Sequence, residues 1–209
     1  MDRLTDSPTV TTLGVMAVVF VCQQVAGVAG LGGLFALSLP LLSRPWTLVT
    51  SVYAHAGLSH LVANALALAL GGLLVERLTT SARFHGFFLV VGVLAGVTQV
   101  AVVGLLGPLV PGIPARVSVL GASGAILGLY GYLLGGNRLT EAVVGGVELS
   151  GRVQLALGAA LAAVITLLTA SPGAALVAHF SGLLLGFLAG RNHLLAPSES
   201  RRDERLTVD

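Results

Sequence analysis

The sequence predicts an all-α polytopic membrane protein, a bundle of six transmembrane helices. Of its 209 residues, 55% are hydrophobic and only 10% are charged, whereas soluble domains carry about 25% charged residues. Six apolar runs each approach the roughly 20 residues needed to cross a bilayer. The chain also has 28 glycines, many of them inside these runs. Such glycines favour close packing of helices in the membrane over disorder.

The predicted spans follow one another with a single long interruption. In chain order they cover residues 10–29, 58–75, 84–106, 119–135, 153–170 and 173–190. The first run is too long for the apolar region of a signal peptide and follows a single arginine, Arg3, so we expect it to be retained. We therefore expect a tail over residues 1–9, one membrane domain over residues 10–191, and a second tail over residues 192–209.

The segment between the first two spans, residues 30–57, is apolar but contains two prolines. It is too irregular to span, so we expect an interfacial loop on the outer face, with Trp46 and Tyr53 at headgroup level. Residues 107–115 contain three prolines and are predicted to form a loop, because proline breaks helices.

The arginines predict the orientation, because positive residues gather on the cytoplasmic side of membrane proteins. With an internal N-terminus, only Arg44 and Arg116 lie outside. The nine cytoplasmic arginines are Arg3, Arg77, Arg83, Arg138, Arg152, Arg191, Arg201, Arg202 and Arg205. We therefore expect a protein of the cell membrane, embedded in the lipid bilayer with both termini cytoplasmic. The net charge of +2 largely reflects this bias, so no nucleic-acid partner is expected.

Polar groups inside the apolar runs are the candidate functional residues, because such groups are costly at membrane depth. Ser123 lies between Gly121 and Gly124, at the start of the fourth span. There the first helical amides have no intrahelical partner, which provides donors for an oxyanion hole beside a nucleophile. Taken alone, a serine in such a helix more often packs as a small residue or bonds to a carbonyl of its own helix.

His179 opens the sixth span, at about the level where the fourth begins. Glycines recur every fourth residue after it, at positions 182, 186 and 190, and the fourth span has a similar stripe at positions 124, 128 and 135. Such stripes favour close helix contact, which would bring His179 within hydrogen-bonding reach of Ser123. A neutral imidazole there can act as a general base. The alternative for His179 alone is a structural bond to a carbonyl of a neighbouring helix.

His60 and Asn64 are four residues apart, hence on one face of the second span. Two neutral donors aimed at one point suit an oxyanion, together with the Ser123 amide. The alternative is a polar pair that only joins helices. Glu76, at the inner end of this span, is expected to be a structural anchor.

The inventory of ionisable residues excludes other protease classes. No His-Glu-x-x-His sequence is present, and the four aspartates all lie in the tails, which argues against metal and aspartyl mechanisms. Cys22 is the only cysteine, so no internal disulfide can form. No cofactor and no metal are expected.

Three motifs together resemble the rhomboid family of intramembrane serine proteases. They are His55-Ala-Gly-Leu-Ser-His60-Leu-Val-Ala-Asn64, Gly121-Ala-Ser-Gly124, and Ala-His-x-x-Gly-x-x-x-Gly from Ala178 to Gly186. They occur in the family's order, and the resemblance covers roughly residues 41–191. It implies a rhomboid-like six-helix bundle that cleaves single-pass transmembrane proteins through an acyl-enzyme.

The resemblance also implies roles for single residues. It makes Ser123 the nucleophile, His179 the general base, and His60 with Asn64 the oxyanion donors, while Gln99 resembles a position that retains the catalytic water. His55, Gly121 and Gly124 are further site candidates. Where the family often has Trp-Arg and an aromatic four residues after the serine, this chain has Trp46-Thr47 and Leu127, so the His179 ring is expected to be less supported.

Two alternatives stay open at this level. One is a catalytically inactive rhomboid-like protein that binds membrane proteins, against which the presence of both Ser123 and His179 argues. The other is a small transporter, for which intramembrane polar groups are also expected. The sequence shows no internal repeat of the transporter kind.

Overall fold

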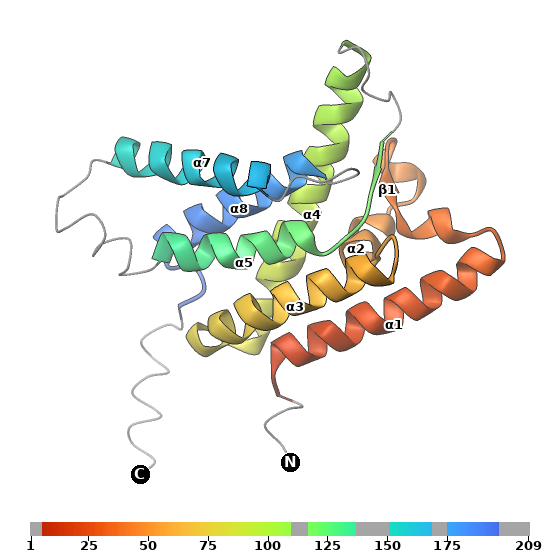
Figure 1. Ribbon diagram of the computed structural model, residues 1–209, viewed down its shortest axis with the longest axis horizontal. Helices are drawn as coiled ribbons and strands as arrows, with labels where there is room; N and C mark the ends of the chain where they lie inside the picture. The colour runs from red at the N-terminus through yellow and green to blue at the C-terminus, as the bar shows by residue number, and fades with distance from the viewer. Residues whose placement is uncertain (1–5, 110–116, 137–150, 169–174, 197–209) are drawn as a thin grey trace.

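The computed structural model describes residues 6–109, 117–136, 151–168 and 175–196, and most of them are helical (Figure 1). The α-helices are α1 (Pro8–Val28), α2 (Thr47–Tyr53), α3 (Leu58–Val75), α4 (Ser81–Leu106), α5 (Ser123–Gly136), α7 (Gly151–Leu168) and α8 (Leu176–Arg191). Short 3₁₀ turns are η1 (Gly32–Phe35), η2 (Leu41–Ser43), η3 (Glu76–Leu78) and η4 (Gly107–Leu109), and the strands are β1 (Leu37–Ser38) and β2 (Ser118–Val119).

Within the described residues, three helical stretches are long and apolar enough to cross a membrane: Pro8–Val28, Leu58–Leu78 and Ser81–Leu109. The described parts of the later helices are shorter, including the apolar stretches Leu155–Leu168 and Leu176–Arg191. The prediction of a helical membrane protein is therefore confirmed, while the count of six spans stays a prediction. The second span has the predicted bounds, because α3 covers Leu58–Val75.

The fourth predicted span begins later than expected. The sequence favoured helix from Val119, but Ser118 and Val119 form β2, and helix α5 starts only at Ser123. Leu37 pairs with Val119 and Ser38 with Ser118 in an antiparallel register. A short apolar run does not distinguish strand from helix, so this pairing with a distant segment could not be read from hydropathy.

The predicted loop after the first span has its own structure. It contains η1, β1, η2 and α2, and the Trp46 indole donates to the Leu34 carbonyl at 3.1 Å while 49% of the side chain is exposed. Tyr53 stacks on Phe88 with ring centroids 6.0 Å apart, and its position at headgroup level stays a prediction. The loop thus packs against the bundle and delivers β1 to the segment that precedes Ser123.

The start of α1 is fixed to the end of α3 by polar contacts. The Ser7 hydroxyl accepts from the Val10 amide and donates to the Glu76 carboxylate at 2.7 Å. Glu76 also accepts from the Thr9 amide at 3.2 Å. A carboxylate at a helix N-terminus satisfies amides that have no intrahelical acceptor, so Glu76 does anchor the helices as expected.

Helix α5 is the centre of the bundle. It contacts α3, α4 and α8, while α1 packs on α3 and α7 packs on α8; Figure 1 shows α5 between α3 and α8, with α4 crossing behind them. Leu195, beyond α8, is buried in the core, and the Arg83 side chain donates to the Ala196 carbonyl. Packing therefore continues past residue 191, where the C-terminal tail was expected to begin.

Candidate active site

Ser123 is the first residue of α5 and follows a sharp turn at Gly121. Gly121 has φ of +128°, a conformation that side chains rarely adopt. Its amide donates to the Ser51 carbonyl at 2.9 Å, which ties the turn to α2. The glycine therefore allows the chain to change from strand β2 to helix α5 within a few residues, with the Ser123 hydroxyl at the start of the helix.

His179 lies in the first turn of α8 and meets Ser123 directly. Its Nε2 is 3.0 Å from the Ser123 hydroxyl oxygen. With the ring proton on Nδ1, the Nε2 lone pair accepts the serine hydrogen. This is the arrangement that a histidine base and a serine nucleophile require.

Glycines bring the two helices close enough for that contact. A Cβ atom added at Gly182 would stand 2.1 Å from the Gly124 carbonyl oxygen, and one at Gly186 would stand 2.0 Å from the Gly128 oxygen. Real Cβ atoms essentially never come within 3.0 Å of another heavy atom. Only glycine fits at these positions, and the contact expected from the two glycine stripes is present.

The His60 imidazole lies beside Ser123, over the Gly121 backbone. A Cβ added at Gly121 would stand 2.8 Å from His60 Cε1, 3.1 Å from His60 Nε2 and 3.9 Å from the Ser123 oxygen. Asn64 is buried one turn further along α3, and its side-chain nitrogen donates to the His60 carbonyl at 3.1 Å. His60 is therefore within reach of a group bound at Ser123, while one contact of Asn64 is to its own helix.

His55 is fully buried behind His60. Its Nδ1 is 3.0 Å from the Tyr53 carbonyl, so Nδ1 carries the proton, and its backbone amide donates to the Gln23 side chain at 3.0 Å. The ring meets His60 edge-on, with centroids 5.1 Å apart. Burial, and then electrostatic repulsion between the protonated forms of His55 and His60, lowers the pKa of His55 to about 4, against the smaller opposing effect of the Tyr53 bond. His55 is therefore neutral at physiological pH and supports His60 through ring contact.

Gln99 contacts the same region from α4. Its side-chain oxygen accepts from the Ala178 amide at 3.1 Å. Ala178 directly precedes His179 in the chain. The structure thus brings Gln99 to the start of α8, next to the histidine.

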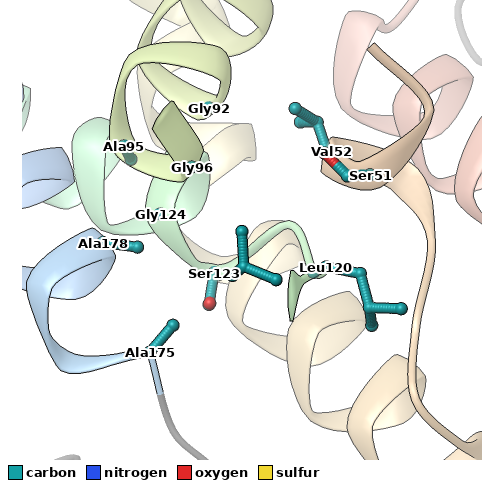
Figure 2. Close-up of a pocket in the computed structure, with 12 residues that line it drawn as sticks. Ser51, Val52, Gly92, Ala95, Gly96, Leu120, Ser123, Gly124, Ala175 and Ala178 are labelled. Carbon is teal, nitrogen blue, oxygen red and sulfur yellow. The ribbon is translucent and has the colours of Figure 1, made fainter. Parts of the chain in front are cut away.

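A pocket opens beside the Ser123 hydroxyl, as Figure 2 shows. Seven of its twelve lining residues are glycine or alanine, so short side chains leave the space free. The lining residues are Ser51, Val52, Gly92, Ala95, Gly96, Val119, Leu120, Gly121, Ser123, Gly124, Ala175 and Ala178. A small group can therefore lie against Ser123 and the Gly121 turn.

Two residues of this region were not singled out from the sequence. Ser51 contributes a backbone carbonyl to Gly121, and backbone contacts leave no signal in a sequence. Gln23 holds the His55 amide; as a polar residue inside the first apolar run, it carried the same signal as the residues that were identified. Within the residues that the structure describes, no group of three or more His, Cys, Asp or Glu side chains could hold a metal ion.

The sequence matches the model of a known protein family. The family model described as Rhomboid domain matches residues 42–194, well over half of the chain. This range contains Ser123, His179, His60 and the turn at Gly121. Among curated proteins, none matches the chain.

Proposed function

The chain belongs to the rhomboid family, and from this premise we propose that it is an intramembrane serine endopeptidase that cleaves transmembrane segments of membrane proteins. The observation that carries the proposal is the 3.0 Å contact between the Ser123 hydroxyl and His179 Nε2. A serine with a base in hydrogen-bond contact is the signature of an activated nucleophile. Ser123 and His179 are the proposed catalytic pair.

In the first step, the Ser123 oxygen attacks the carbonyl carbon of the scissile peptide while His179 Nε2 takes the serine proton. The tetrahedral oxyanion is stabilised by the Ser123 amide, His60 and Asn64, because neutral donors placed where charge develops lower the barrier. His179 then donates its proton to the leaving amine. The C–N bond breaks and leaves an acyl-enzyme on Ser123.

In the second step, water attacks the ester carbon with His179 as base, and the proton returns to Ser123 as the acid product leaves. We propose a dyad without a third acidic member. In the described ranges the acidic residues are Asp6 and Glu76, and Glu76 is bonded to Ser7 and the Thr9 amide at the start of α1. His55 and Gln99, which contact the neighbours of the catalytic groups, supply support instead.

The proposed substrate is a single-pass transmembrane protein that enters from the bilayer. A helical backbone hides its carbonyls in its own hydrogen bonds, so the segment must unwind where protein or water can satisfy the freed groups. The pocket lined by glycine and alanine can receive a short side chain next to the scissile bond. The proposed location is the cell membrane with both termini cytoplasmic, as the arginine distribution indicates.

The test is covalent labelling of the detergent-purified protein by a fluorophosphonate. We expect labelling of wild type, and loss of labelling in Ser123→Ala and in His179→Ala. Ser181→Ala is the matched control, because the Ser181 hydroxyl donates within its own helix, to the Val177 carbonyl at 2.7 Å and to the Ala178 carbonyl at 3.3 Å. This variant should label like wild type.

The same preparations should cleave a model transmembrane substrate in parallel with their labelling. Absence of both labelling and cleavage in folded wild type would contradict the proposal. That result would favour the second candidate, an inactive rhomboid-like protein that binds membrane proteins without cutting them.

A further inference from the structure

Gln99 is a buried polar side chain in a stretch of α4 whose other residues, apart from Thr98, are apolar. It lies on α4 with 8% of its surface exposed. Its side-chain oxygen accepts a hydrogen bond from the Ala178 amide at 3.1 Å, and both groups are buried. The bond joins α4 to α8 through two residues that are 79 positions apart in the sequence. A polar side chain buried among apolar helices indicates a specific contact.

The start of α8 lacks a capping side chain of its own. The residue before the helix is Ala175, which makes no side-chain cap hydrogen bond. The first amides of a helix have no intrahelical acceptor, and a buried amide without a partner is strongly unfavourable. Gln99 therefore does from α4 what a capping serine or aspartate would do from within α8.

Ala178, which directly precedes His179, makes a hydrogen bond to α4 and packs closely against α5. Its amide is bonded to Gln99, and its carbonyl oxygen would lie 3.4 Å from a Cβ on Gly124, the residue after Ser123. That same Cβ position is 2.8 Å from the Ala95 side chain, one helical turn before Gln99. Figure 2 shows Ala95, Gly124 and Ala178 close together where α4, α5 and α8 meet.

The contact between α5 and α8 is made by backbone atoms, because Gly182 and Gly186 place no side chain between the helices. Such a contact brings the helices close together but includes no directional bond from these two residues. The bond from Gln99 is directional and fixes Ala178 at one point along α8. His179 Nε2 must stay about 3 Å from the Ser123 oxygen to act as its base.

We infer that Gln99 is a positioning residue for the general base: through the Ala178 amide it sets the register of α8 and so holds His179 against Ser123. This inference rests on the proposed protease function. It differs from the water-retaining role that the family resemblance implied for Gln99, because it concerns the first chemical step, before water takes part.

The experiment measures the rate at which a fluorophosphonate labels Ser123 in the full-length protein. In this reaction an oxygen–phosphorus bond forms, the phosphorus–fluorine bond breaks, fluoride leaves, and the serine proton passes to His179. No water is consumed. The variants are Gln99→Met, which has similar length but no acceptor, and Gln99→Glu, which keeps a carbonyl oxygen in place.

Thr98→Val is the matched control on the same helix, because the Thr98 hydroxyl bonds only to the Leu94 carbonyl of its own helix in the described contacts. We expect labelling of Gln99→Met to fall by about 10- to 100-fold, since a displacement of about 1 Å near reacting groups has effects of this order. Gln99→Glu and Thr98→Val should label within a few-fold of wild type. Thermal unfolding of each variant, measured in the same detergent, corrects for the folded fraction.

Three outcomes would overturn the inference while leaving the protease proposal intact. In the first, folded Gln99→Met labels at the wild-type rate and loses only substrate turnover, which would assign Gln99 to the hydrolytic water. In the second, Gln99→Met and Gln99→Glu lose labelling equally, so the acceptor oxygen is not what matters. If Gln99→Met does not fold, Gln99→Asn replaces it. The asparagine side chain keeps the polar amide but is shorter by one methylene, so its oxygen no longer reaches the Ala178 amide. The third outcome is labelling of Gln99→Asn at the wild-type rate.

Absence of both labelling and substrate cleavage in folded wild type is a different result. It would reject the protease proposal itself, and the positioning role of Gln99 with it. The wild-type measurement therefore separates failure of the function from failure of the positioning role.

Discussion

A single methyl group at Gly186 should separate the two helices that carry Ser123 and His179. In Gly186→Ala the new Cβ would stand 2.0 Å from the Gly128 carbonyl oxygen and 2.8 Å from the Gly128 Cα. Both are backbone atoms of α5, so no side-chain rotation relieves the clash. The helices themselves must move.

The size of that movement follows from the packing. To bring the Cβ to 3.0 Å, the shortest separation that real Cβ atoms show, α8 must shift by about 1 Å. If the shift reaches the first turn of α8, the 3.0 Å contact between Ser123 and His179 lengthens to about 4 Å, outside hydrogen-bonding range. A misplacement of this size costs on the order of 10²-fold in rate, and an overpacked contact costs about 1–3 kcal/mol in stability.

The assay is the rate of fluorophosphonate labelling, with the thermal unfolding midpoint measured on the same sample. Gly86→Ala in α4 is the control, because no atom lies within 4 Å of the Cβ it would add. Since glycine in a helix is less favourable than alanine by about 0.5–1 kcal/mol, this control should be neutral or slightly stabilising. Wild-type labelling together with an unchanged midpoint in Gly186→Ala would refute the close contact of α5 and α8.

Three further perturbations probe the support around the site. Gly121→Ala should abolish labelling but leave the protein folded. The reason is that φ of +128° is strained for alanine and the new Cβ would stand 2.8 Å from the His60 ring. Labelling at the wild-type rate would contradict this. Glu76→Ala should lower the free energy of unfolding by about 1–2 kcal/mol in denaturant titrations, because it removes the acceptor for the Ser7 hydroxyl. Labelling by the folded fraction should change little. An unchanged free energy of unfolding would show that the Glu76 contact is dispensable. Because the pKa of His55 is lowered in the folded state to about 4, against about 6.5 unfolded, its contribution to stability is complete above about pH 6.5 and is lost as pH falls toward 4. The free energy of unfolding of wild type, measured by denaturant titration, should thus fall over this range more steeply than that of His55→Gln, by up to about 1.4 kcal/mol per pH unit. Parallel pH profiles of the two proteins would reject this.

Hydrophobic pattern and glycine spacing predicted the parts of the fold that depend on local sequence. The bounds of α3 agree at both ends, and the stripes at Gly182 and Gly186 correctly indicated which helix lies against α5. Both signals are periodic, and each reports a face of one helix. These two glycine faces were enough to predict a contact between Ser123 and His179.

Contacts between backbone groups were beyond the reach of the sequence. The Ser51 carbonyl holds the Gly121 amide, and any residue at position 51 supplies a carbonyl, so residue type carries no information. The start of α5 was misplaced for a related reason. Ser118 and Val119 pair with β1, more than 70 residues earlier, and apolar strand and apolar helix look alike over so few residues.

The polar side chains are where sequence and structure complement each other. A polar residue inside an apolar run signals a functional contact but does not say with what. Gln23, His55 and Gln99 all use that contact to hold a backbone group near the site: Gln23 bonds the His55 amide, His55 the Tyr53 carbonyl, and Gln99 the Ala178 amide.

This division of roles follows from the membrane. Lipid offers no hydrophobic driving force between helices, so their association depends on close packing and on hydrogen bonds. Glycines supply the packing between α5 and α8, which includes no directional bond from Gly182 or Gly186. Directional bonds from a few buried polar residues must then fix the register. The rate of fluorophosphonate labelling is therefore expected to depend on Gln99 as well as on the proposed catalytic pair Ser123 and His179, because substitution of Gln99 should alter the alignment of the site.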